Sequence, residues 1–206
     1  SCNMKLLLAL LLASMMLSAG CGGFKAKRVD AAESDEKAME ITDQWVAGDT
    51  EKVVRDILKQ IQDHKGFQTF LRKKGAAPKI FIADVQNMTS EAYFPINDIN
   101  DEMLNEFSSS GDFTLIDAAA RDAVLKEITY QNDGMVDPGD AKKVGKQTGA
   151  ELMVFGNVYM KPESRDGKTI KQYSVNVRMT EIEKAVEVLR VRTKLSKFSE
   201  QKKTGW

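Results

Sequence analysis

Few side chains in this sequence of 206 residues are suited to acid–base or nucleophilic catalysis. His64 is the only histidine that could act as a base and no Gly-x-Ser-x-Gly motif occurs, so we expect no serine hydrolase triad. Cys2 and Cys21 are the only cysteines, too few for a Cys/His zinc site. We therefore expect no enzyme, no cofactor and no metal. A glycosidase pair stays open, because the fold places such carboxylates and the sequence holds 30 acidic residues.

Two further clusters resemble ligand sites but have simpler structural explanations. Asp133, Asp137 and Asp140 are acidic enough for calcium, yet they lack the spacing of the twelve-residue loop and its final glutamate. Asp137 precedes a proline and is better explained as a helix N-cap. Gly145 and Gly149 lack the Gly-Lys-Ser/Thr ending of a phosphate loop, so close helix packing and a helix C-cap account for them.

The thiol of Cys21 is the one side chain whose surroundings predict a covalent reaction. An apolar run from Leu6 to Gly20 follows Lys5, as in a secretory signal, and Met4 is the natural start of that signal. The run is shorter than the roughly 18 to 20 apolar residues that a membrane-crossing helix needs. It ends in Leu-Ser-Ala-Gly-Cys, which is similar to the bacterial lipobox.

We accordingly expect cleavage before Cys21 and a lipid anchor, with acyl chains such as palmitate, on its sulfur. Ser18 stands where leucine is commonest in such motifs. The alternative is that Cys21 is merely a small residue near an ordinary cleavage site. Gly22, where aspartate would favour retention in the inner membrane, favours the outer membrane. Cys2 would be removed with the signal, which leaves no disulfide.

Composition predicts one globular domain with a short tether. Hydrophobic residues make up 42% of the chain, and 30 basic residues balance 30 acidic ones, so no bulk charge favours nucleic acid. We divide the chain into a signal peptide (1–20), the lipidated cysteine and a flexible tether (21–48), a globular domain (49–196) and a polar tail (197–206). A tether of about 25 residues has a root-mean-square span of only about 25 to 30 Å.

Hydrophobic periodicity predicts an α/β (α+β) fold with a mixed sheet of about five strands and helices packed on it. The last two strands should form an antiparallel hairpin. Gly156 suggests a bulge or a close helix, and 161–168 reads as a charged loop. The expected strands are 79–85, 113–117, 151–160, 173–180 and 186–195. The expected helices cover about 49–64, 67–75, 96–110, 118–130 and 137–148.

Four segments in order resemble one family. They are Asp-Val-Gln-Asn-Met-Thr-Ser at 84–90, Phe-Thr-Leu-Ile-Asp-Ala-Ala-Ala-Arg-Asp at 113–122, Tyr-Gln-Asn-Asp-Gly-Met-Val-Asp-Pro at 130–138 and Gly-Ala-Glu-Leu-Met-Val-Phe-Gly-Asn at 149–157. Over roughly 45–195 the chain resembles LpoB-type lipoproteins, which activate penicillin-binding proteins. The tether departs from the family pattern, because relatives from enteric bacteria carry a long proline-rich one. The final turn, 181–187, also lacks the glycine that is frequent there.

The resemblance implies an outer-membrane lipoprotein facing the periplasm. Its domain, similar to the N-terminal domain of TolB, would bind a class A penicillin-binding protein and stimulate peptidoglycan synthesis. We expect a monomer that does no chemistry itself. Tyr130, Gln131 and Met135 are candidate contact residues, although Tyr130 and Met135 could instead close the core beneath their loop. The alternatives are a CsgG-like secretion lipoprotein or an envelope lipoprotein with another partner.

Overall fold

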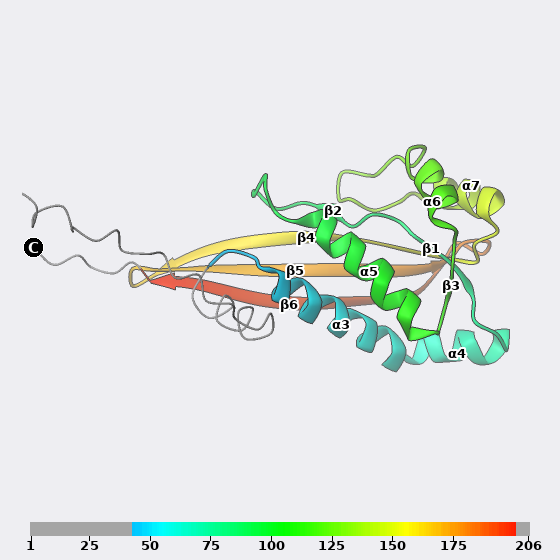
Figure 1. Cartoon of the computed structure of the whole chain (residues 1–206), viewed down its shortest axis with the longest axis horizontal. Coiled ribbons are helices and arrows are strands. Elements are labelled where there is room, and N and C mark those ends of the chain that lie inside the picture. The colour runs from blue at the N-terminus through cyan, green and yellow to red at the C-terminus, as the bar shows by residue number, and fades with distance from the viewer. Residues whose placement is uncertain (1–42, 201–206) are drawn as a thin grey trace, which may run out of the picture. The chain divides into compact units, whose positions relative to one another are not determined.

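The computed structural model describes residues 43–200. Cys21, the signal and most of the expected tether lie outside the described residues. The described chain folds around one six-stranded mixed sheet (Figure 1). Its helices are α3 (Ala47–Asp63), α4 (Lys65–Lys74), α5 (Ile96–Ser110), α6 (Ala118–Leu125) and α7 (Pro138–Thr148). Its strands are β1 (Lys79–Ile82), β2 (Gln86–Asn87), β3 (Thr114–Leu115), β4 (Leu152–Arg165), β5 (Lys168–Glu181) and β6 (Val186–Glu200).

The sheet has the order β3-β1-β4-β5-β6, with β2 paired to β4 off this path. β1 lies parallel to β3 and β4, whereas β4, β5 and β6 are antiparallel. The predicted mixed sheet with helices and a C-terminal antiparallel hairpin is confirmed. The sixth strand, β2, was not predicted because only Gln86 and Asn87 form it, beside Asn157 and Val158 of β4.

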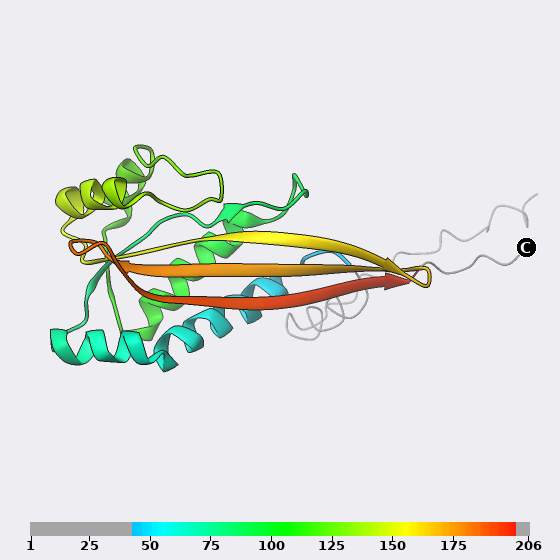
Figure 2. The same ribbon diagram turned by 180° about the vertical axis from the view of Figure 1, so that it is seen from behind.

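Helices cover the two faces of the sheet unequally. On one face, α3 and α5 bury the larger core, in which Ile57, Ile99 and Val177 are fully buried. On the other face, a smaller core under α6 and α7 contains Phe81 and Phe155 from β1 and β4. The long strands β5 and β6 have no helix over this second face (Figure 2). One half of the sheet is therefore open on that side.

The first helix begins earlier than its predicted start at Asp49. The carboxylate of Asp49 accepts the backbone N–H of Val46 at 3.0 Å, which places Val46 at the N-cap. Trp45 packs edge-on to Phe94 and Tyr173, with centroid separations of 5.1 and 5.0 Å. Residues assigned from sequence to the end of the tether thus belong to the core.

The charged loop predicted at 161–168 is wrong. β4 continues to Arg165, and β5 begins at Lys168 after a two-residue turn at Asp166 and Gly167. Both turn residues have positive φ, 52° and 75°, as the favoured type of two-residue hairpin turn requires. Both faces of this hairpin end are exposed, so its sequence is charged on both sides and shows no alternation of apolar and polar residues. The strand pattern is therefore missing from the sequence there.

Two other boundaries and one glycine differ from expectation. β6 runs to Glu200, past the boundary predicted at residue 196. The helix predicted over 118–130 ends at Leu125, because Tyr130 pairs with Val136 in a β-bridge. Gly156 is neither a bulge nor under a helix: a Cβ there would lie 2.2 Å from the carbonyl oxygen of Asn176 on β5.

Among the described helices, none has the length and apolarity to cross a membrane.

Candidate functional site

The three residues nominated from sequence lie on one loop but have different environments. Met135 is only 4% exposed and packs with Val136 in the smaller core. Tyr130 is half-buried and packs against the same core. Gln131 is exposed, and its backbone N–H donates to the carbonyl of Met135 at 2.8 Å. Gln131 is therefore the accessible member, while Tyr130 and Met135 hold the loop on the sheet.

The hydroxyl of Tyr130 already has a structural partner. It accepts the backbone N–H of Asp84 at 3.1 Å, just beyond the end of β1. Burial, together with the nearby Asp84 carboxylate, raises the pKa of Tyr130 to about 12. Arg121 completes the arrangement, because it donates to Asp84 at 2.7 Å and to the carbonyl of Ile82 at 2.7 Å. A neutral, hydrogen-bonded phenol fits a structural role better than acid–base chemistry.

Beside this loop lies the uncovered side of the three long strands, which we call the open face. It comprises the side chains of β4, β5 and β6 that alternate with those in the larger core. Figure 2 looks onto this side of the strands. Its cross-strand rows are Phe155–Arg178–Arg190, Asn157–Asn176–Arg192, Tyr159–Ser174–Lys194, Lys161–Gln172–Ser196 and Glu163–Ile170–Phe198.

The open face carries two of the large apolar side chains that the described chain exposes. Tyr159 is 40% exposed and Phe198 is 62% exposed. Ile170 is the cross-strand partner of Phe198 and is half-buried beside it. Aromatic residues together with arginine are enriched at protein interfaces and at their energetic hot spots. The composition of the open face is thus that of a protein-binding surface.

A chain of three hydrogen bonds runs across the open face from the loop to the edge strand. The amide of Asn157 donates to the carbonyl of Asp133 at 2.8 Å, and the amide of Asn176 donates to the Asn157 oxygen at 2.8 Å. Nε of Arg192 donates to the Asn176 oxygen at 2.6 Å. The loop, β4, β5 and β6 are therefore joined by side chains as well as by the backbone ladder.

Arginines gather where this hydrogen-bond chain ends. Arg178 and Arg190 are direct cross-strand partners, an arrangement that is unfavourable for like charges. Glu187 neutralises Arg190 through two hydrogen bonds of 2.7 and 2.9 Å, and these lower the pKa of the Glu187 carboxyl. Arg178 forms no hydrogen bond or ion pair within residues 43–200, although its charge also helps to lower the pKa of Glu187.

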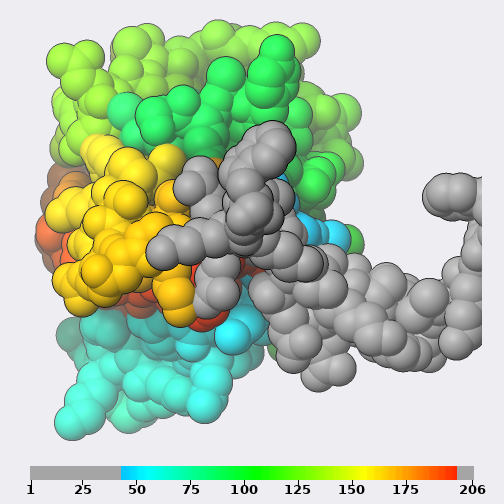
Figure 3. Space-filling view, turned by 90° about the vertical axis from the view of Figure 1, so that its left-hand side faces the viewer, coloured from blue at the N-terminus to red at the C-terminus, as the bar shows by residue number. Residues whose placement is uncertain are grey.

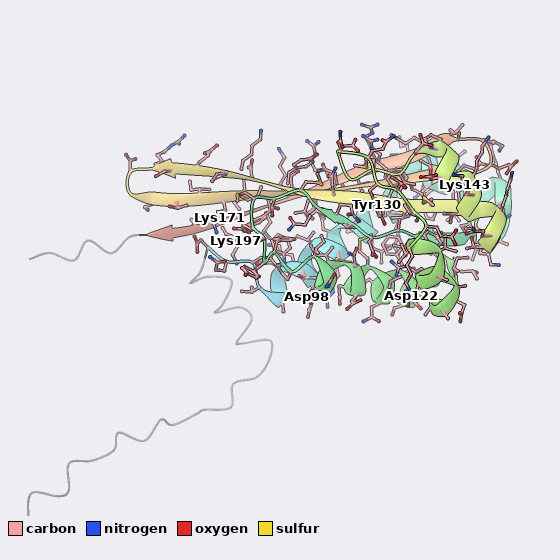
Figure 4. All side chains as sticks on the ribbon, turned by 90° about the horizontal axis from the view of Figure 1, so that it is seen from above. Asp98, Asp122, Tyr130, Lys143, Lys171 and Lys197 are labelled. Atoms are coloured by element: carbon pink, nitrogen blue, oxygen red, sulfur yellow. The ribbon has the colours of Figure 1, made fainter. Side chains whose placement is uncertain are left out.

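The opposite, helix-covered face holds a second charged cluster close to where the described chain begins. Lys171 and Lys197 are cross-strand partners there, and Figure 4 shows them together, far from Lys143. Nζ of Lys197 donates to Asp49 at 2.7 Å, and Nζ of Lys171 donates to Glu91 at 2.7 Å. The hydrogen bond to Glu91 raises the pKa of Lys171.

Glu91 also accepts the hydroxyl of Tyr173 at 2.7 Å. Each carboxylate oxygen of Glu91 is thus engaged by a neighbouring donor. Figure 3 looks at the end of the domain that carries the β4–β5 turn, where the ends of the long strands lie between green segments above and cyan helices below. The hydrogen bonds of Lys171, Tyr173 and Lys197 join these layers rather than presenting reactive groups. Within the described range, no group of three or more His, Cys, Asp or Glu side chains could hold a metal ion.

Sequence reasoning missed the full extent of the open face because it assigned the last part of β4, residues 161–165, to a loop. The signal that could have found it is the dipeptide Asp166-Gly167, the strongest short-range indication of a hairpin. Pairing the chain outward from that turn places Tyr159 on the same row as Ser174. The positions of Arg178 and Arg192 relative to each other depend on how β6 pairs with β5. The local sequence does not indicate the register of that pairing.

Comparison with known proteins supports one family. A family model described as peptidoglycan-synthase activator LpoB matches residues 49–193. Among solved structures, the LpoB C-terminal domain from Escherichia coli has a TM-score of 0.53 and 11% identity, covering 72% of this chain and 99% of that chain. At this identity the likeness supports the fold alone. None of the curated proteins matches the sequence.

Two further solved structures are similar at lower scores. The LpoB C-terminal domain from Salmonella enterica has a TM-score of 0.46 and 12% identity, covering 74% of this chain and 96% of that chain. Lipoprotein GNA1162 from Neisseria meningitidis has a TM-score of 0.46 and 13% identity, covering 62% of this chain and 88% of that chain. Neither likeness identifies a functional residue in this chain.

Proposed function

Because this chain belongs to the family of the peptidoglycan-synthase activator LpoB, we propose that it is a non-catalytic regulator that binds and activates a class A penicillin-binding protein. The observation that carries the proposal is the match over residues 49–193, which spans α3 to β6 and so includes every described helix and strand at least in part. The regulator would be an outer-membrane lipoprotein, anchored through Cys21, with its domain in the periplasm.

Activation without chemistry requires a difference in affinity. A bound protein shifts the synthase toward its active conformation only if it binds that conformation more tightly than the inactive one. A tenfold rise in the active population over the inactive one needs about 1.4 kcal/mol of differential binding free energy. The open face supports this role, because its exposed aromatic side chains and arginines can supply contacts of that size.

The proposal is tested with the organism's own class A synthase in detergent. The full chain is added at increasing concentration, and glycan polymerisation and peptide cross-linking are measured. We expect both rates to rise to a plateau, with half-saturation at the dissociation constant measured separately by biolayer interferometry. An unrelated lipoprotein with the same anchor serves as the control. Unchanged rates at saturating concentration would contradict the proposal.

The anchor is tested in cells. Cys21→Ala removes the thiol that would carry the lipid, so the protein should leave the outer-membrane fraction and appear in the soluble periplasmic fraction. The position of the anchor would be decisive if residues 22–42 act as the predicted tether, because a linker of about 20 residues spans only about 25 Å on average. We expect a variant with a lengthened tether to activate the synthase in cells at least as well as the natural chain. Retention of the Cys21→Ala variant in the outer membrane would contradict lipidation.

A further inference from the structure

The open face is hollowed beside the loop, and the hollow has its own chemistry. A cavity of about 400 Å³ lies between the loop and strands β4, β5 and β6. Its lining includes Asp133, Asn157, Tyr159, Arg178, Arg190 and Arg192. We call it the arginine hollow. Its volume is large enough for one or two side chains of a protein partner.

The hydrogen-bond chain across the open face fixes one guanidinium of this hollow. Asn176 accepts only Nε of Arg192, so the two terminal nitrogens of Arg192 form no hydrogen bond within the described chain. Because Asn176 is itself held by Asn157, and Asn157 by the loop carbonyl of Asp133, the guanidinium is positioned before any ligand arrives. Preorganised donors lose little entropy when they bind.

The arginine hollow has more basic than acidic side chains in its lining, since it contains three arginines and one aspartate. Glu187 is engaged by Arg190, and Asp133 accepts the backbone N–H of Met135 at 3.0 Å. Neither carboxylate forms a hydrogen bond or ion pair with Arg178 or with the terminal nitrogens of Arg192. Glu187 lies close enough to Arg178 for that guanidinium to help lower the pKa of the carboxyl, but its oxygens are engaged by Arg190. The fold thus places two guanidinium groups beside one cavity without a directly bonded acidic partner, and such locally unsatisfied charges are expected mainly at functional sites.

We propose that Arg178 and Arg192 form a binding seat for a carboxylate side chain on the protein partner of this domain. A guanidinium presents its donors as a planar fork that matches both oxygens of a carboxylate. Tyr159 lines the same hollow and exposes its ring, so the apolar part of an aspartate- or glutamate-bearing segment can pack on it. The partner surface is therefore acidic where it meets the hollow.

The identity of the partner in this inference rests on the proposed function. The preference of the seat for a carboxylate does not, because it follows from the arginines themselves. In the first experiment, the full chain and its Arg178→Glu and Arg192→Glu variants are bound to the detergent-solubilised synthase at several salt concentrations. We expect each reversal to weaken binding about 10- to 100-fold. Arg72→Glu, on α4 away from the open face, should bind within about twofold of the natural chain.

The double Arg178→Gln, Arg192→Gln variant checks the fold, because it removes both charges without adding new ones. It should melt within a few degrees of the natural chain and still bind more weakly. If the natural chain binds the synthase and both charge reversals bind it equally well, the carboxylate seat is wrong. If the natural chain does not bind, the proposed function is wrong and the second experiment decides the seat.

The second experiment uses no synthase. The Nε–H signal of Arg192 is followed by NMR while a hexa-aspartate peptide, a hexa-serine peptide or inorganic phosphate is added to the full chain. A saturable shift with hexa-aspartate at concentrations where phosphate and hexa-serine have no effect supports the seat. An equal response to phosphate indicates a general anion site and overturns the proposal, as does the absence of any response to hexa-aspartate.

Discussion

Nζ of Lys197, near the end of the edge strand, lies 2.7 Å from Oδ2 of Asp49 in the first turn of α3, and the two side chains are only 3% and 2% exposed. A buried ion pair of this kind is costly to break, because the remaining charge has no water around it. It also directs a cation inward from an edge strand, which is one way in which natural sheets discourage pairing with other chains.

We expect Asp49→Ala to lower the free energy of unfolding by about 3 to 5 kcal/mol, because it leaves the buried Lys197 ammonium without its counter-charge. Urea denaturation followed by circular dichroism measures this. Replacing both partners, as in Asp49→Leu with Lys197→Met, should recover most of the loss, since neither charge then remains. The exposed pair Arg55 and Glu51 is the control, and Arg55→Ala should cost less than about 1 kcal/mol. A loss of that small size for Asp49→Ala would contradict the buried pair.

A chain that begins at Asp49 tests where the domain starts. It lacks Trp45, whose ring packs edge-on against the stacked rings of Phe94 and Tyr173. We expect it to lose about 3 to 5 kcal/mol of stability, the usual cost of deleting a buried tryptophan. A chain that begins at Asp43 should be as stable as the full chain. Equal stability of the two truncated chains would restore the boundary predicted from the sequence.

Stability at alkaline pH should depend on Tyr130. Its pKa is raised from 10.0 to about 12 by burial, so the folded domain keeps the phenol neutral while the unfolded chain ionises it. This contribution is complete below pH 10 and is lost as the pH rises toward 12. Tyr130→Phe should flatten that part of the stability curve, whereas Tyr93→Phe, at a fully exposed ring, should leave its slope unchanged. Identical slopes for Tyr130→Phe and the natural chain would disprove the assignment.

The turn between β5 and β6 carries strain that a substitution can release. Ala185 has φ of 53°, in the left-handed region that favours glycine. Ala185→Gly should therefore raise the free energy of unfolding by about 1 kcal/mol. Further along α6, past its first turn, Ala123→Gly should have the opposite sign, a loss of about 0.5 to 1 kcal/mol. A destabilised Ala185→Gly variant would show that the turn adopts another conformation in solution.

The hydrogen-bond chain across the open face should control how firmly the loop is held. Asn176→Ala removes the acceptor of Arg192 and the donor to Asn157. We expect a loss of about 1 to 3 kcal/mol. The backbone amide of Gln131, which donates to Met135, should exchange its hydrogen faster. Ser174→Ala, one row away on β5, should change neither property. Unchanged exchange at Gln131 would contradict coupling between β5 and the loop.

Local signals in the sequence predicted the helices and the buried strands well. Asp137 caps α7 as expected, since its carboxylate accepts the N–H of Gly139 at 2.7 Å. Gly149 ends that helix with a φ of 72°. A Cβ on Gly145 would meet Ile182 at 2.7 Å, which confirms the close packing inferred from the glycine spacing. Both helix caps depend on residues close together in the chain, whereas the contact of Gly145 with Ile182 was inferred only in general terms from the glycine spacing.

Features that depend on distant partners were not predictable. Nothing near Lys197 in sequence indicates that Asp49 will neutralise it, so the segment appeared to be a solvated tail. The arginine hollow likewise needs the register of β5 against β6, which includes an irregularity between Met179 and Thr180. Within the loop, Met135 appeared as a possible contact because exposure cannot be read from residue type, and the structure buries it.

The three linked side chains of the open face also constrain how this family can diverge. Asn157, Asn176 and Arg192 each occupy a different strand, yet each satisfies the polar group of the next. A single substitution leaves a neighbour without its partner, so selection should remove most one-step changes. Among relatives, these three positions are expected to co-vary as a set, with rare double or triple replacements. Correlated change at positions 157, 176 and 192 in an alignment would then record the maintenance of this hydrogen-bond chain across β4, β5 and β6.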